Sequence, residues 1–276
     1  MQKIELLIID PQVDFCDPSG SLFVPGADED MVRLAAMIDR MGDKLNRIRV
    51  TLDCHHLIDV AHPKFWRNSE GKSPDPFTII SVEDVENGTW QPFHPSLNKR
   101  MKEYVKALEK NGQFQHCIWP PHCLIGSDGC KVYPVLYESL LQWESNKSWN
   151  IDYVSKGSNL YCEHFGILEA QVPDPQDPST QINTVLIEAL MQADTILIAG
   201  EAGSHCLKVS VEQIAEKFGD DSYVKKIVLL TDATSPVQSP VVDFPAIQEQ
   251  FIQDMTTRGM RTSTTVDFLA EAVATV

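Results

Sequence analysis

The sequence predicts an α/β fold built on a mainly parallel sheet. Short runs rich in aliphatic residues alternate with segments of helical spacing along most of the chain, which is typical of repeated βαβ units. Two of these runs, TILIAG at 195–200 and KIVLLTDA at 226–233, are almost wholly apolar, as expected of parallel strands buried on both faces. We therefore expect a central sheet with helices on both sides.

Six strands and six helices account for this alternation. The strands are expected at about 3–9, 47–52, 151–155, 194–199, 225–231 and 260–265. The helices are expected at about 29–45, 96–110, 134–145, 181–192, 205–218 and 243–258. Each helix lies between or beside strands, so it can connect two parallel neighbours.

The segment at about 63–133 departs from this alternation. It holds a stretch rich in Pro, Gly and Asp, and then the motif WPPHCLIGSDGC. Long irregular segments are usually lids, binding loops or disordered, but aromatic residues here favour a packed excursion: Phe65, Trp66, Phe77, Trp90 and Phe93. We expect a single domain over 1–276 whose excursion returns over the active edge of the sheet.

Composition narrows the class of protein. The 276 residues are 43% hydrophobic, which supports a full core, and the net charge of −16 argues against binding nucleic acid through a basic surface. The seven cysteines form no CxxC pair, so we expect reduced thiols rather than a disulfide framework.

The first apolar run ends at Asp10 and is too short for a signal peptide or a membrane span. A cytoplasmic location is the expectation.

Two candidate catalytic residues lie where predicted strands end. Asp10 ends the run LLIID, and Cys206 follows TILIAG after a Gly-rich turn, where a helix should begin. In open parallel sheets, ligands collect at the carboxyl ends of the strands. A thiol at a helix N-terminus gains thiolate character. This pattern indicates a cysteine nucleophile with a carboxylate partner, the alternative being a cysteine that only packs.

The residues around Cys206 suggest further roles. Backbone N–H groups of the turn at 200–205 and of the helix start can stabilise a developing oxyanion. His205 points in a different direction from its neighbour Cys206, so we expect it to pack or cap rather than to form a Cys–His dyad. Lys156, directly after another strand, can lower a thiol pKa or orient a carboxylate, whereas a solvated surface lysine is the alternative.

A second group of residues is suited to a metal ion. Asp53 and His55 follow the strand RIRVTL, and His122 lies further along in WPPHC. One carboxylate and imidazoles are ligands that suit Zn, Fe or Mn. His62 is a further candidate, whereas His56 adjoins His55 and is expected to point elsewhere. In the alternative interpretation, Asp53 caps a turn and the histidines are ordinary loop residues.

Two aromatic residues accompany these groups. Phe15 lies near Asp10 in the sequence, and Trp119 lies near His122. An aromatic pair suits the two faces of a flat ring substrate. Packing in the core is the alternative.

Five segments together resemble the nicotinamidase branch of the isochorismatase-like cysteine hydrolases. In the order found in that family they are IIDPQVDF, TLDCH, WPPHC, SKG and GEAGSHC, and they span nearly the whole chain. The resemblance implies a Rossmann-like three-layer α/β/α sandwich with a central six-stranded, mainly parallel sheet. There are departures: Glu201 stands where bacterial relatives usually carry an aliphatic residue, and Ser204 where Asp is common.

The resemblance also implies roles for individual residues. It implies the catalytic triad Asp10, Lys156 and Cys206. It implies one divalent metal, with zinc the first expectation and Fe or Mn the alternatives, on Asp53, His55 and His122, with His62 as an extra candidate ligand. It implies an oxyanion hole from the amides of Ala202 and Cys206, a cis peptide between Glu201 and Ala202, and substrate contacts from Phe15 and Trp119.

The implied activity is the deamination of nicotinamide to nicotinic acid and ammonia through a thioester, a step of NAD salvage. Two other interpretations stay open: a related cysteine hydrolase acting on another small amide or a carbamoyl compound, and a catalytically silent binding module. The expected partner is a small amide, with neither nucleic acid nor membrane, and a homo-oligomer is left open.

Overall fold

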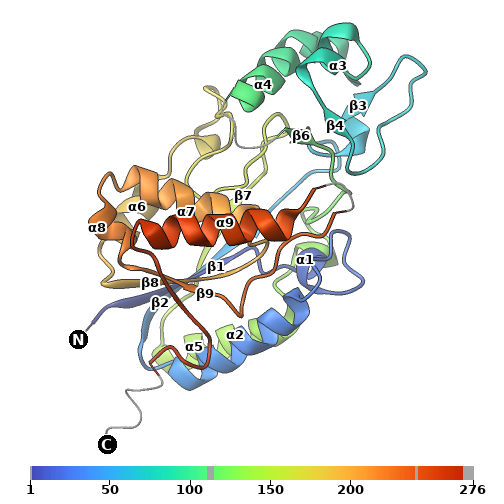
Figure 1. The fold of residues 1–276 in the computed structure, drawn as a ribbon. Coiled ribbons are helices and arrows are strands. Elements are labelled where there is room, and N and C mark those ends of the chain that lie inside the picture. The colour runs from blue at the N-terminus through green and yellow to red at the C-terminus, as the bar shows by residue number, and fades with distance from the viewer. Residues whose placement is uncertain (1, 111–114, 240–241, 270–276) are drawn as a thin grey trace, which may run out of the picture.

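A computed structural model describes residues 2–110, 115–239 and 242–269 (Figure 1). Six strands form the main sheet, in the order β10–β9–β8–β1–β2–β7, and every neighbouring pair is parallel. They are β1 (Ile4–Ile9), β2 (Leu45–Asp53), β7 (Asp152–Lys156), β8 (Thr195–Gly200), β9 (Ile227–Leu230) and β10 (Arg261–Ser263). The predicted α/β fold with a parallel six-stranded sheet is confirmed.

Helices cover both faces of this sheet (Figure 1). One layer contains α2 (Ala27–Met41) and α5 (Pro134–Lys147). The other contains α6 (Thr184–Met191), α7 (Cys206–Lys217), α8 (Asp221–Val224) and α9 (Phe244–Thr257). The three-layer sandwich that the resemblance implies is therefore present. Helix α2 ends four residues earlier than predicted, because Gly42 follows it and β2 already begins at Leu45.

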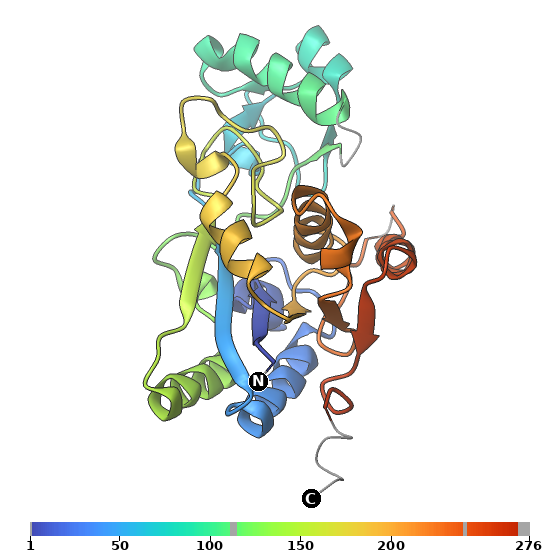
Figure 2. The ribbon, with the colours of Figure 1, turned by 90° about the vertical axis from the view of Figure 1, so that its left-hand side faces the viewer.

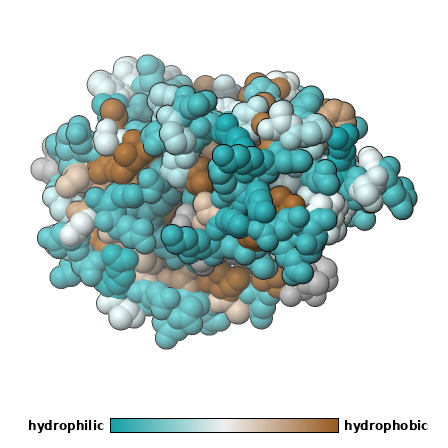
Figure 3. Space-filling view, turned by 90° about the horizontal axis from the view of Figure 1, so that it is seen from above, coloured by the Kyte–Doolittle hydropathy of each residue, from teal (hydrophilic) through white to brown (hydrophobic). Residues whose placement is uncertain are grey.

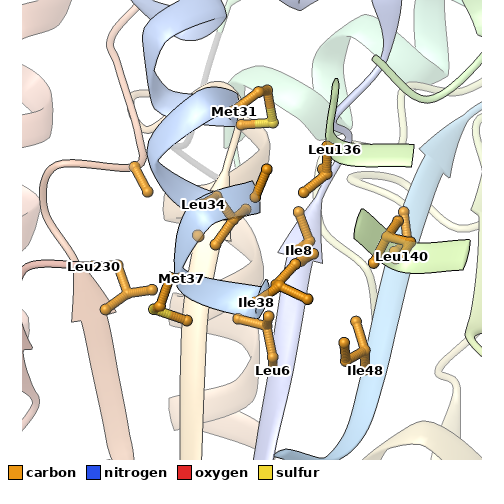
Figure 4. Packing of buried hydrophobic residues seen from close by; sticks show 14 of the residues in the cluster. Leu6, Ile8, Met31, Leu34, Met37, Ile38, Ile48, Leu136, Leu140 and Leu230 are labelled. Carbon is orange, nitrogen blue, oxygen red and sulfur yellow. The ribbon is translucent and has the colours of Figure 1, made fainter. Parts of the chain in front are cut away.

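Side chains of the central strand β1 pack against the helices on both faces of the sheet. Because side chains alternate along a strand, Leu6 and Ile8 pack towards α2 and α5, whereas Leu7 and Ile9 pack towards α7 and α9. Figure 4 shows the first of these clusters, in which side chains of α2 and α5 close over the sheet. Burying each such aliphatic side chain contributes about 1.5–3 kcal/mol. This packing fixes where β1 ends and thus where Asp10 lies.

The predicted excursion is packed. Its elements are η1 (Pro63–Phe65), β3 (Trp66–Arg67), β4 (Ile79–Ile80), α3 (Val82–Asn87), β5 (Gln91–Pro92), η2 (Pro95–Leu97), α4 (Asn98–Lys110), β6 (His116–Cys117) and η3 (Asp128–Cys130). A third apolar cluster holds Phe65 and Trp66, with Trp90 packed against it. Phe77 and Phe93 are 42% and 53% exposed, so the expectation that they pack was wrong, since their segments run along the surface.

The excursion stands at the end of the molecule opposite α2 and α5, as two views agree (Figures 1 and 2). Seen from that end, the surface is mostly hydrophilic with scattered apolar patches (Figure 3). Two further short helices, α1 (Val13–Cys16) and η4 (Pro178–Thr180), lie in loops of the main domain. Across the described ranges, each helix is either too short or too polar to cross a membrane.

Candidate active site

The ends of four parallel strands bring the predicted residues to one edge of the sheet. Asp10 follows β1, Asp53 ends β2 and Lys156 ends β7. Cys206 begins α7, which follows β8. Strands β2 and β7 are in register so that Asp53 and Lys156 are direct partners. The carboxyl ends of parallel strands are the usual place for a ligand site.

Lys156 lies between two carboxylates and the thiol. Its Nζ atom is 2.8 Å from Asp10 Oδ2, 3.2 Å from Asp53 Oδ1 and 3.7 Å from Cys206 Sγ. All four residues are buried, so Lys156 is not the solvated lysine of the alternative interpretation. Burial lowers the pKa of Lys156, but Asp10 and Asp53 outweigh it, and the net shift is well above the usual range. The lysine therefore stays charged and holds the cluster together.

Asp10 is fixed from two sides. Thr51 Oγ1 donates to Asp10 Oδ1 at 2.5 Å and accepts the Asp10 N–H at 2.9 Å. The Asp10 backbone has φ of 43°, in the left-handed region that Asp tolerates better than most residues. The sequence analysis did not identify Thr51, although its place two residues before Asp53 puts both side chains on the same face of β2.

The surroundings of Cys206 shift the pKa of its thiol in opposite directions. Burial raises the pKa of Cys206 well above its usual range, Lys156 lowers it, and Asp10 raises it, in part through a hydrogen bond with the thiol. Burial opposes the thiolate character expected of a thiol at a helix N-terminus, whereas Lys156 favours it. The arrangement pairs the thiol with a carboxylate that can accept its proton.

The turn before Cys206 presents two amides. The peptide bond between Glu201 and Ala202 is cis, as the resemblance implies. Gly200, at φ of 109°, must be glycine because a Cβ there would lie 2.1 Å from Ile9 O. In the part of the chain that the structure describes, neither Ala202 nor Cys206 donates its N–H to another protein group. Both amides are thus left for a ligand oxygen.

Glu201 is anchored below this turn. It is fully buried, and its Oε2 accepts the Ser235 N–H at 3.1 Å. Ser235 Oγ in turn donates to Asp30 Oδ2 at 2.6 Å. Burial, reinforced by Asp30, raises the pKa of Glu201 well above its usual range. Burial therefore favours the neutral form of the Glu201 carboxyl group.

Asp53, His55 and His122 form a cluster suited to a metal ion. One ligand atom from each lies within 4.8 Å of the others, and all three residues are buried. The Nε2 atoms of His55 and His122 lie 2.9 Å and 3.6 Å from Asp53 Oδ2. A carboxylate with two imidazoles is a donor set that Zn, Fe and Mn all accept.

The outer contacts of both histidines also fit a metal. His55 Nδ1 lies 3.1 Å from Asp59 Oδ2, and His122 Nδ1 lies 2.8 Å from Pro120 O. Both Nδ1 atoms are therefore placed to donate, as is usual for metal-bound histidines, which leaves the Nε2 lone pairs facing Asp53. The two Nε2 atoms and the Asp53 carboxylate are all hydrogen-bond acceptors in this arrangement, so a proton or a cation must lie between them. Asp59 was not identified from the sequence, although it lies four residues after His55.

His62 is adjacent to this cluster but outside it. Its Nε2 is 3.4 Å from His122 Nδ1, and its Nδ1 is 3.0 Å from His56 O. Burial, with His122 and His55 adding to it, lowers the pKa of His62 to about 4, so the ring is neutral. His56 is exposed and lies apart, as expected.

A cavity joins the two groups of residues. Phe15 and Trp119 line it together with Cys206, as do residues that the sequence analysis missed: Leu22, Val24, Glu163, His164, Phe165 and Val237. Burial raises the pKa of Glu163 to about 8. His205 packs edge-on against Trp119 and Phe244, with ring centroids 5.3 Å and 4.5 Å away, which confirms its packing role. The sequence does not indicate that Glu163 and His164 line the cavity, because they lie in an irregular loop with no recognisable motif.

Comparisons with known proteins agree with this geometry at the level of fold. No protein-family model and no curated protein sequence matched the chain. Solved structures did match. The yeast nicotinamidase Pnc1p is 19% identical, covers 94% of this chain and 98% of its own, and has a TM-score of 0.61. A nicotinamidase–pyrazinamidase of Acinetobacter baumanii is 17% identical, with coverages of 98% and 99% and a TM-score of 0.61.

A third structure carries a metal. The pyrazinamidase of Pyrococcus horikoshii, solved in complex with zinc, is 17% identical, with coverages of 95% and 99% and a TM-score of 0.55. These likenesses extend over almost the entire length of every chain compared. The chain has the fold of the nicotinamidases and pyrazinamidases, as its sequence motifs predict.

Proposed function

We propose that the protein is a metal-dependent cysteine amidohydrolase that converts nicotinamide to nicotinic acid and ammonia. The observation that carries the proposal is the contact of Lys156 with Asp10, Asp53 and Cys206 in one buried cluster. It gives a nucleophile, a proton acceptor and a fixed positive charge at the carboxyl edge of the sheet. The likeness to solved nicotinamidases, one of them bound to the inhibitor nicotinaldehyde, supports the choice of substrate.

In the proposed reaction, Asp10 accepts the Cys206 proton as the sulfur attacks the carboxamide carbon. The amides of Ala202 and Cys206 hold the oxyanion, and each such donor contributes on the order of 3–4 kcal/mol. Asp10 then protonates the departing ammonia, which leaves a thioester. Water activated by Asp10 hydrolyses the thioester to the acid. General acid–base help of this kind contributes about 100- to 10,000-fold.

The remaining residues position the ring. Phe15 and Trp119 line the cavity and offer aromatic surfaces to a flat substrate. Asp53, His55 and His122 would hold the metal ion. When bound, a divalent cation supplies an electrophilic contact for a ring nitrogen. Lys156 favours the ionised form of Asp10 before proton transfer and holds its carboxylate in place.

Ammonia release from nicotinamide tests the proposal directly. The wild-type protein and a Cys117→Ser control should release ammonia, whereas Cys206→Ala should lose activity while keeping its fold by circular dichroism. Retention of most of the activity by Cys206→Ala would overturn the mechanism. If another small amide or a carbamoyl compound is the only one hydrolysed, the chemistry stands and the substrate assignment is wrong.

Removing the metal tests whether the proposed hydrolase depends on it. Stripping the protein with a chelator should weaken substrate binding, and adding Zn or Mn should restore it. Unchanged substrate affinity and activity in metal-free protein would remove the metal from the proposal.

A further inference from the structure

Two thiols outside the proposed mechanism lie side by side. Cys54 Sγ and Cys130 Sγ are 4.0 Å apart, and both residues are partly exposed. Cys130 also lines a surface cavity beside Leu52 and Tyr153. Four other cysteines are buried, and the third partly exposed one, Cys117, lies in β6 of the excursion. An oxidant from solvent can therefore reach this pair without entering the cavity that Cys206 lines.

The pair is attached to the candidate metal cluster. Cys54 lies between Asp53 and His55 in the chain, so any shift of its backbone moves both ligands. On the other side, Gln12 Nε2 donates to Asp53 O at 2.7 Å and to Cys130 O at 3.1 Å, and it lies 3.5 Å from Cys130 Sγ. A single amide group thus connects Cys130 to the backbone of Asp53.

We propose that Cys54 and Cys130 form a reversible disulfide when the protein meets a peroxide, and that this bond weakens metal binding at Asp53, His55 and His122. The second half rests on the proposed function, whereas the bond itself does not. A disulfide needs the sulfurs about 2.05 Å apart. Closing from 4.0 Å draws both residues together and disturbs the Gln12 contacts and the backbone between the two ligands.

The chemistry balances with hydrogen peroxide as the oxidant. One thiol, as its thiolate, attacks a peroxide oxygen and becomes a sulfenic acid, while the peroxide O–O bond breaks and releases water after protonation. The second thiol then attacks the sulfenic sulfur. The S–S bond forms, the S–O bond breaks, and a second water leaves. A dithiol reductant reverses the step through thiol–disulfide exchange.

The test uses the zinc-loaded full-length protein in a Cys206→Ala background, so that oxidation of the proposed nucleophile cannot contribute. The protein is treated with hydrogen peroxide, free thiols are alkylated, and disulfide-linked peptides are identified by mass spectrometry. Zinc release is followed with a chromogenic chelator. Cys54→Ser and Cys130→Ser are added separately, with Cys117→Ser as the matched control.

We expect a Cys54–Cys130 crosslink in the parent and in the Cys117→Ser control, with a loss of zinc affinity of about tenfold or more that dithiothreitol reverses. Both should be absent in the other two variants. A missing crosslink overturns the proposal, and a crosslink without zinc release overturns its coupling to the metal. Should the parent bind no zinc before oxidation, the proposed metal fails, while the crosslink still decides whether the thiols form the bond.

Discussion

Asp53 and Lys156 are direct partners across strands β2 and β7, and their side chains meet with 3.2 Å between Oδ1 and Nζ. Because Lys156 also contacts Asp10 at 2.8 Å, one buried cation joins the proposed proton acceptor to the candidate metal cluster. Two buried carboxylates facing one cation are costly to separate from it, since each depends on the same charge. Removing the charge of Lys156 should therefore affect both the catalytic residues and the candidate metal cluster.

Replacing the cation should destabilise the fold strongly. Lys156→Met leaves Asp10 and Asp53 buried without it, and the free energy of unfolding should fall by about 3–5 kcal/mol. Adding Asp10→Asn removes one of the opposed charges, so the double variant should be less destabilised than the sum of the two single variants, by about 1 kcal/mol or more. Urea unfolding at pH 7 measures all four proteins. Lys99→Met is the control, because Lys99 is exposed on helix α4, and it should cost under about 1 kcal/mol.

If the effects of Lys156→Met and Asp10→Asn on the free energy of unfolding simply add, the two side chains do not interact in the way that the structure indicates.

Gln12 should support metal binding from outside the ligand set. It accepts the Asp53 N–H and donates to the Asp53 carbonyl, both at 2.7 Å, and it is fully buried. Gln12→Leu leaves these two backbone groups without their partner, at about 1–3 kcal/mol each, and should lower zinc affinity about 10- to 100-fold. Competition with a chelator of known affinity measures the second effect, and the exposed Gln142→Leu is the control. Equal zinc affinity in Gln12→Leu and wild type would show that Gln12 does not position Asp53.

Glu201 should make stability depend on pH. A carboxyl group whose pKa is raised by folding adds stability below its unfolded pKa of about 4.5, and that stability is lost as the pH rises towards the folded pKa. Glu201→Gln keeps the shape of the neutral group and removes its titration. The stability of Glu201→Gln relative to wild type should therefore increase between pH 5 and pH 8. Urea unfolding at the two pH values measures this, with the exposed Glu188→Gln as control. A difference that does not change with pH would mean that Glu201 is ionised in the native protein.

The fold was predictable from the sequence because its strands are buried on both faces. Runs such as TILIAG are nearly continuous in apolar residues, and they recur between segments of helical period. The excursion was harder to predict. Phe77 and Phe93 look like core residues by type, yet they are exposed because the third apolar cluster closes around Trp66 and its neighbours.

The candidate site was predictable where a residue ends a strand, and not where it depends on register or loop placement. Asp10 follows β1 and Lys156 ends β7, and the two meet as the resemblance implies, whereas the contact of Lys156 with Asp53 was not predicted. Gln12 reaches Asp53 only because the loop after β1 lies against the end of β2, and no local pattern encodes that contact. Glu163 lines the cavity from an irregular loop, seven positions beyond β7. Such partners follow from three-dimensional packing rather than from spacing.

The excursion should contribute to the acid sensitivity of the fold through His116. Its ring is buried against Trp66 and Tyr104, and its Nε2 lies 3.0 Å from Val60 O. Burial lowers the pKa of His116 to about 4 from an unfolded value of 6.5. Between these values the unfolded chain binds a proton that the native protein does not, so stability falls as the pH falls, by about 3 kcal/mol in total.

A substitution isolates this contribution. His116→Gln keeps an N–H donor for Val60 but does not titrate, so the advantage of wild type over the variant should shrink as the pH falls from 7 to 4. The exposed His94→Gln should show no such trend. Urea unfolding across the range gives both differences. If the difference between wild type and His116→Gln is the same at pH 7 and pH 4, the native ring takes up its proton as readily as the unfolded chain does. Acid sensitivity would then come only from other buried histidines, such as His164 and His205, whose pKa values burial lowers to about 3.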